Sequence, residues 1–195
     1  ISIVVGDVSG KGISASLYMS RFQGIMRSLF FNGFTNPKTI LEKLNQSIFK
    51  EIDKNAFVTC IFSEFNWENK TYSCARAGHS PMLHFRPSEN KFLDIVSNGI
   101  GLGLTSSSLF NKNLEIYSNN FLKDDIFVLY SDGISEAMNV EFDEFGDERL
   151  AKIIKDNYRL NSKKLANTVI SSIKQFVGSS DPHDDITLAI IKIKN

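Results

Sequence analysis

Long apolar runs are absent from this sequence of 195 residues. Its most apolar stretches, such as residues 186–191, fall far short of the roughly 20 residues that cross a bilayer. No charged start leads into an apolar signal segment either. The sequence therefore predicts a cytoplasmic domain without membrane contact of its own, although a parent protein could be tethered through an upstream region.

Net charge is absent as well, because 22 Lys and Arg residues balance 22 Asp and Glu residues. Without a positive field over its surface, the chain is a poor candidate for nucleic-acid binding. Cysteine is scarce too, and a chain of this size can bury a sufficient core without disulfides. We therefore interpret Cys60 and Cys74 as ordinary reduced residues.

Internal repeats and Pro-, Gly- or Ser-rich linkers are also lacking, and the four prolines are scattered. This pattern favours one domain over residues 1–195. The chain opens directly into the strand-like run Ile1–Gly6, with no initiator Met and no preceding turn. We therefore expect the domain to be N-terminally truncated and to lack its first strands.

Apolar residues at three- and four-residue steps predict helices over residues 13–30 and 37–52, and again around 150–154 and 165–176. Short runs rich in Val, Ile, Phe and Tyr predict strands; they cover residues 57–65, 71–76, 82–86, 91–96, 113–118, 125–131 and 186–193. The short spacers suit hairpins, which favours antiparallel pairing. The predicted fold class is α+β, with helices packed on a sheet sandwich.

An Asp stands at three places where an apolar strand runs into a glycine or polar turn: Val4–Gly12, Leu129–Gly133 and Asp184–Thr187. A partly buried carboxylate needs a counter-charge. No Lys or Arg lies near Asp132 or Asp184 in sequence, so a cation from solution is a candidate. Carboxylates and carbonyls are hard oxygen ligands that suit magnesium, manganese or calcium better than zinc.

Each segment also has a simpler interpretation, since an Asp before Gly is typical of turns and helix caps. A phosphate loop is excluded for the first segment, because only three residues separate Gly6 from Gly10-Lys11 where the pattern needs four. Asp185 could replace Asp184 as a ligand. Side-chain alternation along a strand predicts that only one of the two reaches a metal.

Seven segments carry a wider resemblance; they are Gly6–Gly12, Phe57–Thr59, Ala77–Pro81, Gly101–Gly103, Tyr130–Ala137, Phe145–Gly146 and Asp184–Thr187. In content and order they resemble the metal-dependent PPM protein phosphatases, specifically the bacterial SpoIIE/RsbU type. The resemblance implies a four-layer αββα fold, in which helices flank an antiparallel β-sandwich.

The same resemblance implies a site for two Mn²⁺ or Mg²⁺ ions. Asp7 would bridge both metals, the Val8 carbonyl would complete one coordination shell, and Asp132 and Asp184 would each supply a carboxylate. The activity implied is hydrolysis of phosphoserine or phosphothreonine by a metal-activated water, so no side-chain nucleophile is required.

The implied partners are a phosphorylated anti-sigma-factor antagonist as substrate and an upstream sensor domain in the parent chain; the oligomeric state stays open. The chain departs from the family in three ways. The further metal Asp that the family carries upstream in a Gly-Gly-Asp motif is not in this sequence and is either cut off or absent. Ser9 stands where eukaryotic relatives have a His, and the phosphate-binding Arg of those relatives would also fall upstream. The alternative is therefore a catalytically inactive PPM-like module that binds or regulates.

Other polar residues are interpreted without a catalytic role. We expect His79 to bond a turn carbonyl and His183 to be solvated, while His84 in a strand suggests no function. The acidic residues 124–125 are predicted to form a solvated turn before a strand. Lys11 could contact phosphate or simply be exposed.

Overall fold

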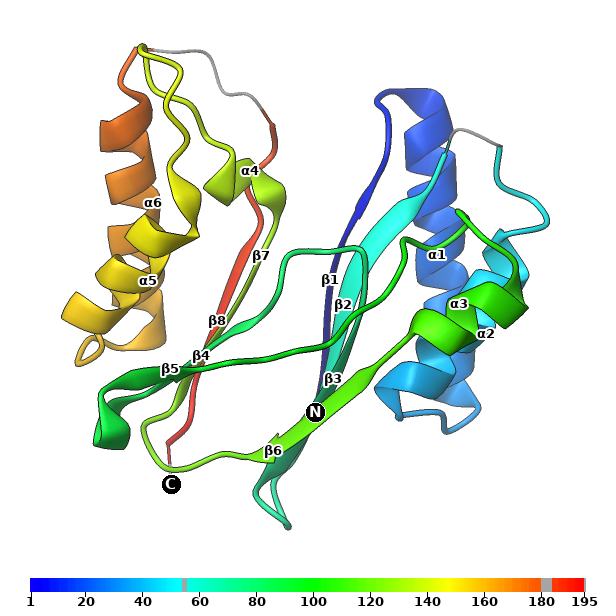
Figure 1. Cartoon of the computed structure of the whole chain (residues 1–195), viewed down its shortest axis with the longest axis horizontal. Helices are drawn as coiled ribbons and strands as arrows, with labels where there is room; N and C mark the ends of the chain where they lie inside the picture. Colours follow the sequence, from blue (N-terminus) through cyan, green and yellow to red (C-terminus); the bar gives the residue numbers. More distant parts are fainter. Residues whose placement is uncertain (54–55, 180–183, 195) are drawn as a thin grey trace. The chain divides into compact units, whose positions relative to one another are not determined.

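The computed structural model of the chain describes residues 1–53, 56–179 and 184–194. The chain forms two compact units: the first comprises Ile1–Pro81 with Val96–Asn120, and the second Met82–Ile95 with Phe121–Asn195. Each unit holds a four-stranded sheet with helices on one face (Figure 1). All pairs of named strands are antiparallel, as the short spacers predicted.

The sheet of the first unit has the order β1-β2-β3-β6. Its strands are β1 (Ser2–Val8), β2 (Val58–Asn66), β3 (Thr71–Ala77) and β6 (Ile116–Asn120). β1 is an edge strand, and its register with β2 places Asp7 opposite Thr59. The first predicted Asp therefore lies near the end of a paired strand.

Three helices belong to the first unit: α1 (Ile13–Phe31), α2 (Pro37–Ile48) and α3 (Ser107–Asn113). The Asn36 side chain caps α2 by accepting a bond from the Thr39 N–H, and Pro37 occupies the first helical turn. α2 ends at Ile48, earlier than predicted, and is followed by a turn in which the Glu51 and Ile52 amides both donate to the Ile48 carbonyl. α3 was not predicted.

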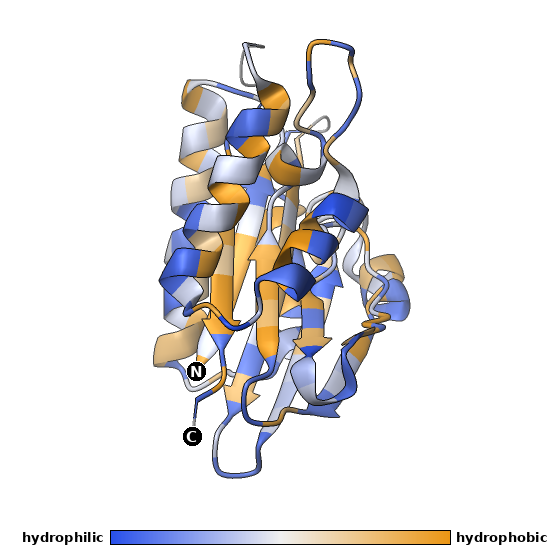
Figure 2. Cartoon of the chain, turned by 90° about the vertical axis from the view of Figure 1, so that its left-hand side faces the viewer, coloured by the Kyte–Doolittle hydropathy of each residue, from blue (hydrophilic) through white to orange (hydrophobic). Residues whose placement is uncertain are grey.

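The second unit has the sheet order β5-β4-β7-β8. Its strands are β4 (Leu83–Arg86), β5 (Lys91–Leu93), β7 (Ile126–Tyr130) and β8 (Leu188–Lys192), and a short 3₁₀ turn, η1 (Pro87–Glu89), joins β4 to β5. β7 is buried along its whole length, which matches its apolar sequence. Figure 2 shows strands coloured mainly as hydrophobic beside helices whose colours alternate.

The helices of the second unit are α4 (Asp132–Ser135), α5 (Gly146–Asp156) and α6 (Ser162–Val177). α5 and α6 bury one stripe each, formed by Leu150, Ile154, Leu165, Val169 and Ile173. These residues recur at the three- and four-residue steps from which the sequence predicted both helices. α4 is a single short turn that carries no such period, and the sequence did not reveal it.

A buried polar cluster in the second unit overturns one expectation. Asp125 is fully buried, and its Oδ2 lies 2.8 Å from Nε2 of His84. The same oxygen accepts bonds from Arg86 Nε and Nη2, both at 3.2 Å, and from the Leu122 amide at 2.9 Å. The prediction of a solvated turn is therefore wrong for Asp125, because a buried guanidinium supplies its counter-charge.

The two cysteines are free and buried in the first unit. Burial raises the pKa of both thiols, that of Cys74 to about 12, because removing the group from water disfavours the thiolate. Both therefore stay neutral near pH 7 and are poor nucleophiles. Their interpretation as ordinary reduced residues is confirmed.

Among the described residues, no helix combines the length and the apolar character that crossing a membrane requires.

Candidate metal centre

The first predicted ligand, Asp7, is exposed near the end of β1. Val4 and Val8 pack on the helix-facing core of the unit. Asp7 therefore projects from the opposite face of the sheet, because side chains alternate along a strand. Beyond it, Gly10 and Gly12 adopt φ angles of 87° and 86°, which lets the chain turn from β1 into α1.

The β1–β2 ladder sets the direction of the Val8 carbonyl. Ser9 and Phe57 exchange bonds, since the Ser9 N–H donates to the Phe57 carbonyl at 2.9 Å and the Phe57 N–H donates to Ser9 Oγ at 2.8 Å. Val8 and Val58 consequently form a non-hydrogen-bonded pair, and the Val58 N–H donates instead to the Leu102 carbonyl. The Val8 carbonyl thus points away from β2, toward the open edge of the sheet.

The other segments of the first unit that carried the resemblance support this strand end. Thr59 Oγ1 lies 3.0 Å from Nδ1 of His79, which is buried. We expected a turn carbonyl as a partner of His79, and at Nδ1 the partner is a hydroxyl. The fully buried Asn45 accepts a bond from the Gly103 amide at 2.9 Å and donates to the Thr105 carbonyl at 3.2 Å. Sequence reasoning missed Asn45, whose partners lie about 60 residues away.

A cavity of about 430 Å³ adjoins the β1–α1 turn. Its lining includes Ser9, Lys11, Ser14, Tyr18 and Asp53. Lys11, whose role the sequence left open, is exposed and lines this cavity.

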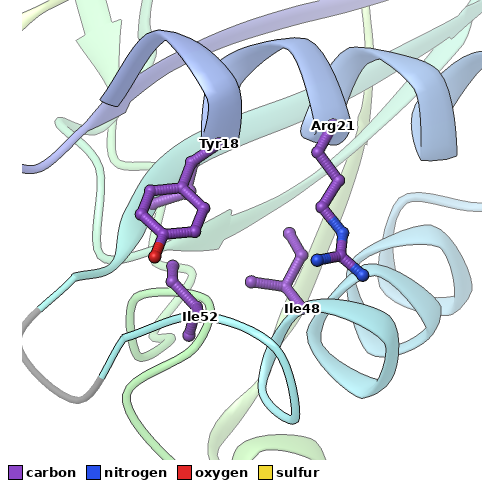
Figure 3. Close-up of a pocket in the computed structure, with 5 residues that line it drawn as sticks. Tyr18, Arg21, Ile48 and Ile52 are labelled. Atoms are coloured by element: carbon purple, nitrogen blue, oxygen red, sulfur yellow. The ribbon is translucent and has the colours of Figure 1, made fainter. Parts of the chain in front are cut away.

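Two side-chain contacts, which we call the clamp, link α1 to the segment after α2 beside the same cavity. The Tyr18 hydroxyl donates to the Asp53 carboxylate at 2.7 Å, which raises the pKa of Tyr18 above its ordinary value. Arg21 forms an ion pair with Glu51. Figure 3 shows Tyr18 and Arg21 reaching from α1 toward Ile48 and Ile52. The clamp therefore ties α1, next to the Asp7 turn, to the chain that leads into β2.

In the second unit, Ser131 joins the end of β7 to the segment before β8. Its N–H donates to the Thr187 carbonyl at 3.1 Å, and its Oγ accepts a bond from the Thr187 N–H at 3.0 Å. The Ser131 hydroxyl also donates to the Asp185 carbonyl at 3.2 Å. These bonds bring two of the three Asp-bearing segments together, although they lie more than 50 residues apart.

Gly133 shows how closely these segments approach. A Cβ atom at this position would lie 2.3 Å from the Asp185 carbonyl oxygen and 3.6 Å from the Asp184 carbonyl carbon. Gly133 therefore packs directly on the carbonyl group of Asp185, and any larger residue would force one of the two segments to move. Asp132 is half-buried, and its Oδ1 accepts a bond from the Gly133 amide at 3.0 Å.

The choice between Asp184 and Asp185 is not decided by alternation. Both residues are exposed and precede β8, which begins at Leu188, so the strand rule does not apply to them. Asp184 Oδ1 accepts a bond from the Asp185 N–H at 2.9 Å, which orients the Asp184 carboxylate. The resemblance implies Asp184, and this choice stays a prediction. His183 lies outside the described residues.

The predicted ligands divide between the units. Asp7 and Val8 belong to the first unit, whereas Asp132 and Asp184 belong to the second. Within neither unit do the described residues bring three His, Cys, Asp or Glu side chains close enough to hold a metal ion.

Solved structures share the fold of this chain. The SiaA-PP2C domain of Pseudomonas aeruginosa matches it with a TM-score of 0.86 and 16% sequence identity, over 99% of this chain and 76% of that one. RsbX in complex with magnesium matches with a TM-score of 0.66 and 16% identity, over 99% and 81% of the two chains. The fold is thus that of PP2C phosphatase domains, and the predicted α+β class is confirmed.

Sequence comparison defines the family. The family model of stage II sporulation protein E (SpoIIE) matches residues 1–194. The phosphoserine phosphatase RsbU of Bacillus subtilis (strain 168) is 30% identical over 198 residues, which cover 100% of this chain and 56% of that protein. The chain therefore belongs to the SpoIIE family, as its seven segments indicated. It spans about half the length of RsbU.

Proposed function

We propose that residues 1–195 act as one metal-dependent phosphatase domain that hydrolyses phosphoserine or phosphothreonine on a protein. The observation that carries this proposal is the close contact of Gly133 with the Asp185 carbonyl group, which brings two predicted ligand segments together. The SpoIIE family model and the relative named phosphoserine phosphatase support the reaction class.

The donor set fits a pair of hard divalent cations. Asp7, Asp132 and Asp184 offer carboxylate oxygens and Val8 offers a carbonyl oxygen, the ligand types that Mg²⁺ and Mn²⁺ prefer. Asp132 and Asp184 form no ion pair with a described Lys or Arg residue. Their negative charge is therefore available to a cation. The magnesium complex of RsbX supports the choice of metal.

Bound cations would activate a water molecule as the nucleophile and offset the charge that builds on the phosphoryl group. The chain itself holds the ligands in place. Ser131 and Gly133 fix the relative position of the Asp132 and Asp184 segments, and the Ser9–Phe57 pair directs the Val8 carbonyl outward. Lys11 lines the neighbouring cavity, where its ammonium would attract the phosphate dianion.

The substrate we propose is a phosphorylated anti-sigma-factor antagonist, with activity governed by a sensor domain upstream in the parent chain. Membership of the SpoIIE family and the similarity to RsbU support this assignment.

Metal removal tests the proposed reaction. Protein stripped with EDTA should lose at least about a thousandfold of its turnover of a phosphoserine peptide, because the cations supply several kcal/mol of transition-state stabilisation. Added Mn²⁺ or Mg²⁺ should restore the rate. Circular dichroism of the stripped protein provides the control for folding. Full turnover in EDTA would rule out metal dependence.

A further inference from the structure

The loop Asn139–Asp143, which follows α4, displays two large apolar side chains to solvent. Val140 is 63% exposed and Phe142 is 83% exposed. Between and beside them stand Glu141 and Asp143, both exposed. The loop tip therefore combines an apolar centre with negative charge.

Hydrogen bonds hold this loop in one conformation. Asn139 Oδ1 accepts bonds from the Glu141 and Asp143 amides, both at 2.9 Å, and the Asn139 N–H donates to the Asp143 carbonyl at 3.1 Å. At its base, the Phe145 N–H donates to the Ala137 carbonyl at 2.8 Å. The side chains of Val140 and Phe142 are therefore displayed by a loop whose backbone is already ordered.

Phe142 occupies an unfavourable backbone conformation, with a φ of 64°. The other described non-glycine residues with positive φ are polar, namely Lys70, Asn90 and Asp124. A bulky aromatic residue is a genuine outlier in this region, where glycine or asparagine is favoured. Because Phe142 is also exposed, burial of its ring does not offset the strain. Strain of this kind is concentrated at functional sites.

The loop follows the proposed metal ligand Asp132 closely in the sequence. Asp132 begins α4, and the loop begins seven residues later at Asn139. Figure 1 shows the yellow-green chain after α4 extending from the same end of the second unit. Seven residues span at most about 25 Å of extended chain, so the loop lies within reach of a folded protein whose phosphoserine is bound at Asp132.

We propose that the Asn139–Asp143 loop is a docking element for the folded phosphoprotein substrate. Val140 and Phe142 enter an apolar depression on that protein, and Glu141 and Asp143 face basic side chains around it. A rigid aromatic contact within a charged rim is the usual composition of an energetic centre in a protein interface. The inference rests on the proposed phosphatase function, since it names how the substrate is recognised.

Phe142→Gly tests this role, because it removes the ring and relieves the backbone strain together. The probes are the serine-phosphorylated anti-sigma-factor antagonist of the source organism, a decapeptide of its phosphosite, and p-nitrophenyl phosphate. We expect kcat/KM for the intact phosphoprotein to fall about 30-fold, and that for both small substrates to change less than about twofold. The melting temperature should stay at the wild-type value or rise by up to about 2 °C, because glycine relieves the backbone strain at this position.

Phe31→Ala provides the matched control. Phe31 is 92% exposed at the last residue of α1, 18 residues or about 27 Å along the helix from Ile13. It should leave the turnover of all three substrates unchanged. Charge reversal in Glu141→Lys should slow the intact phosphoprotein alone, and more at low salt than at high salt.

Three results would overturn the docking role. Equal turnover of the phosphoprotein by wild type and Phe142→Gly would show that the ring is not used. A parallel loss on all three substrates with a lower melting temperature would show a structural role. If Phe142→Gly converted a wild-type dimer to a monomer, the partner bound by the loop would be a second copy of this chain. If the wild type hydrolyses none of the substrates, the phosphatase proposal fails, and direct titration of the phosphoprotein against both variants still decides the docking role.

Discussion

Asp132→Asn should abolish phosphatase turnover, by at least about a thousandfold, while the protein stays folded. The amide keeps an oxygen that can accept the Gly133 N–H bond seen at 3.0 Å, so the start of α4 should persist. It removes the negative charge, and a divalent cation loses both a strong ligand and its counter-charge. A thousandfold loss corresponds to about 4 kcal/mol of transition-state stabilisation. Single-turnover kinetics on a phosphoserine peptide would measure it.

Asp124→Asn is the matched control at the opposite end of β7. Asp124 is exposed with a φ of 69°, a conformation that asparagine tolerates. The same chemical change there should leave turnover unaltered. If Asp132→Asn retained wild-type turnover, the metal role of Asp132 would be wrong. If the wild type itself turned nothing over with metal present, the catalytically inactive module would be the better interpretation.

Gly133→Ala should damage both stability and activity, although it adds only a methyl group. The new Cβ would lie 2.3 Å from the Asp185 carbonyl oxygen, so the Asp184–Thr187 segment must move away. Such overpacking costs about 1–3 kcal/mol of unfolding free energy. A displacement near 1 Å at the proposed ligands lowers turnover about a hundredfold. Urea denaturation and steady-state kinetics would measure the two effects.

Gly24→Ala makes the same change where nothing is crowded. Gly24 is exposed on α1, and a Cβ there would meet no atom within 4 Å. Alanine in a helix is favoured over glycine by about 0.5–1 kcal/mol, so this variant should be slightly more stable and fully active. Wild-type activity in Gly133→Ala would show that the close packing of the two segments does not position the ligands.

The fold was predictable because its signals are local. Burial is visible in the sequence from residues only a few positions apart. Examples are the apolar stripe of Leu165, Val169 and Ile173 on α6 and the continuous apolar run of β7. α3 and α4 escaped prediction because helices of 7 and 4 residues are too short to show a period. The end of α2 was misplaced because apolar spacing continues through Ile52, beyond the last residue of the helix at Ile48.

The candidate site was only partly predictable. Its acidic residues were visible from their places at strand ends, and the seven ordered segments identified the family. The contacts that position them were not visible: the Ser131 hydroxyl meets residues 185 and 187 across more than 50 positions. Asp125 was misjudged for the same reason, since its partners His84 and Arg86 lie about 40 residues away.

Anomalous diffraction at the manganese edge, from crystals of the protein soaked in Mn²⁺, is the most direct test of the proposed centre. We expect two peaks about 3.5–4 Å apart, with the carboxylates of Asp7, Asp132 and Asp184 and the carbonyl of Val8 as protein ligands. Peaks bound elsewhere on the chain, or an Asp7 carboxylate remote from those of Asp132 and Asp184, would contradict it.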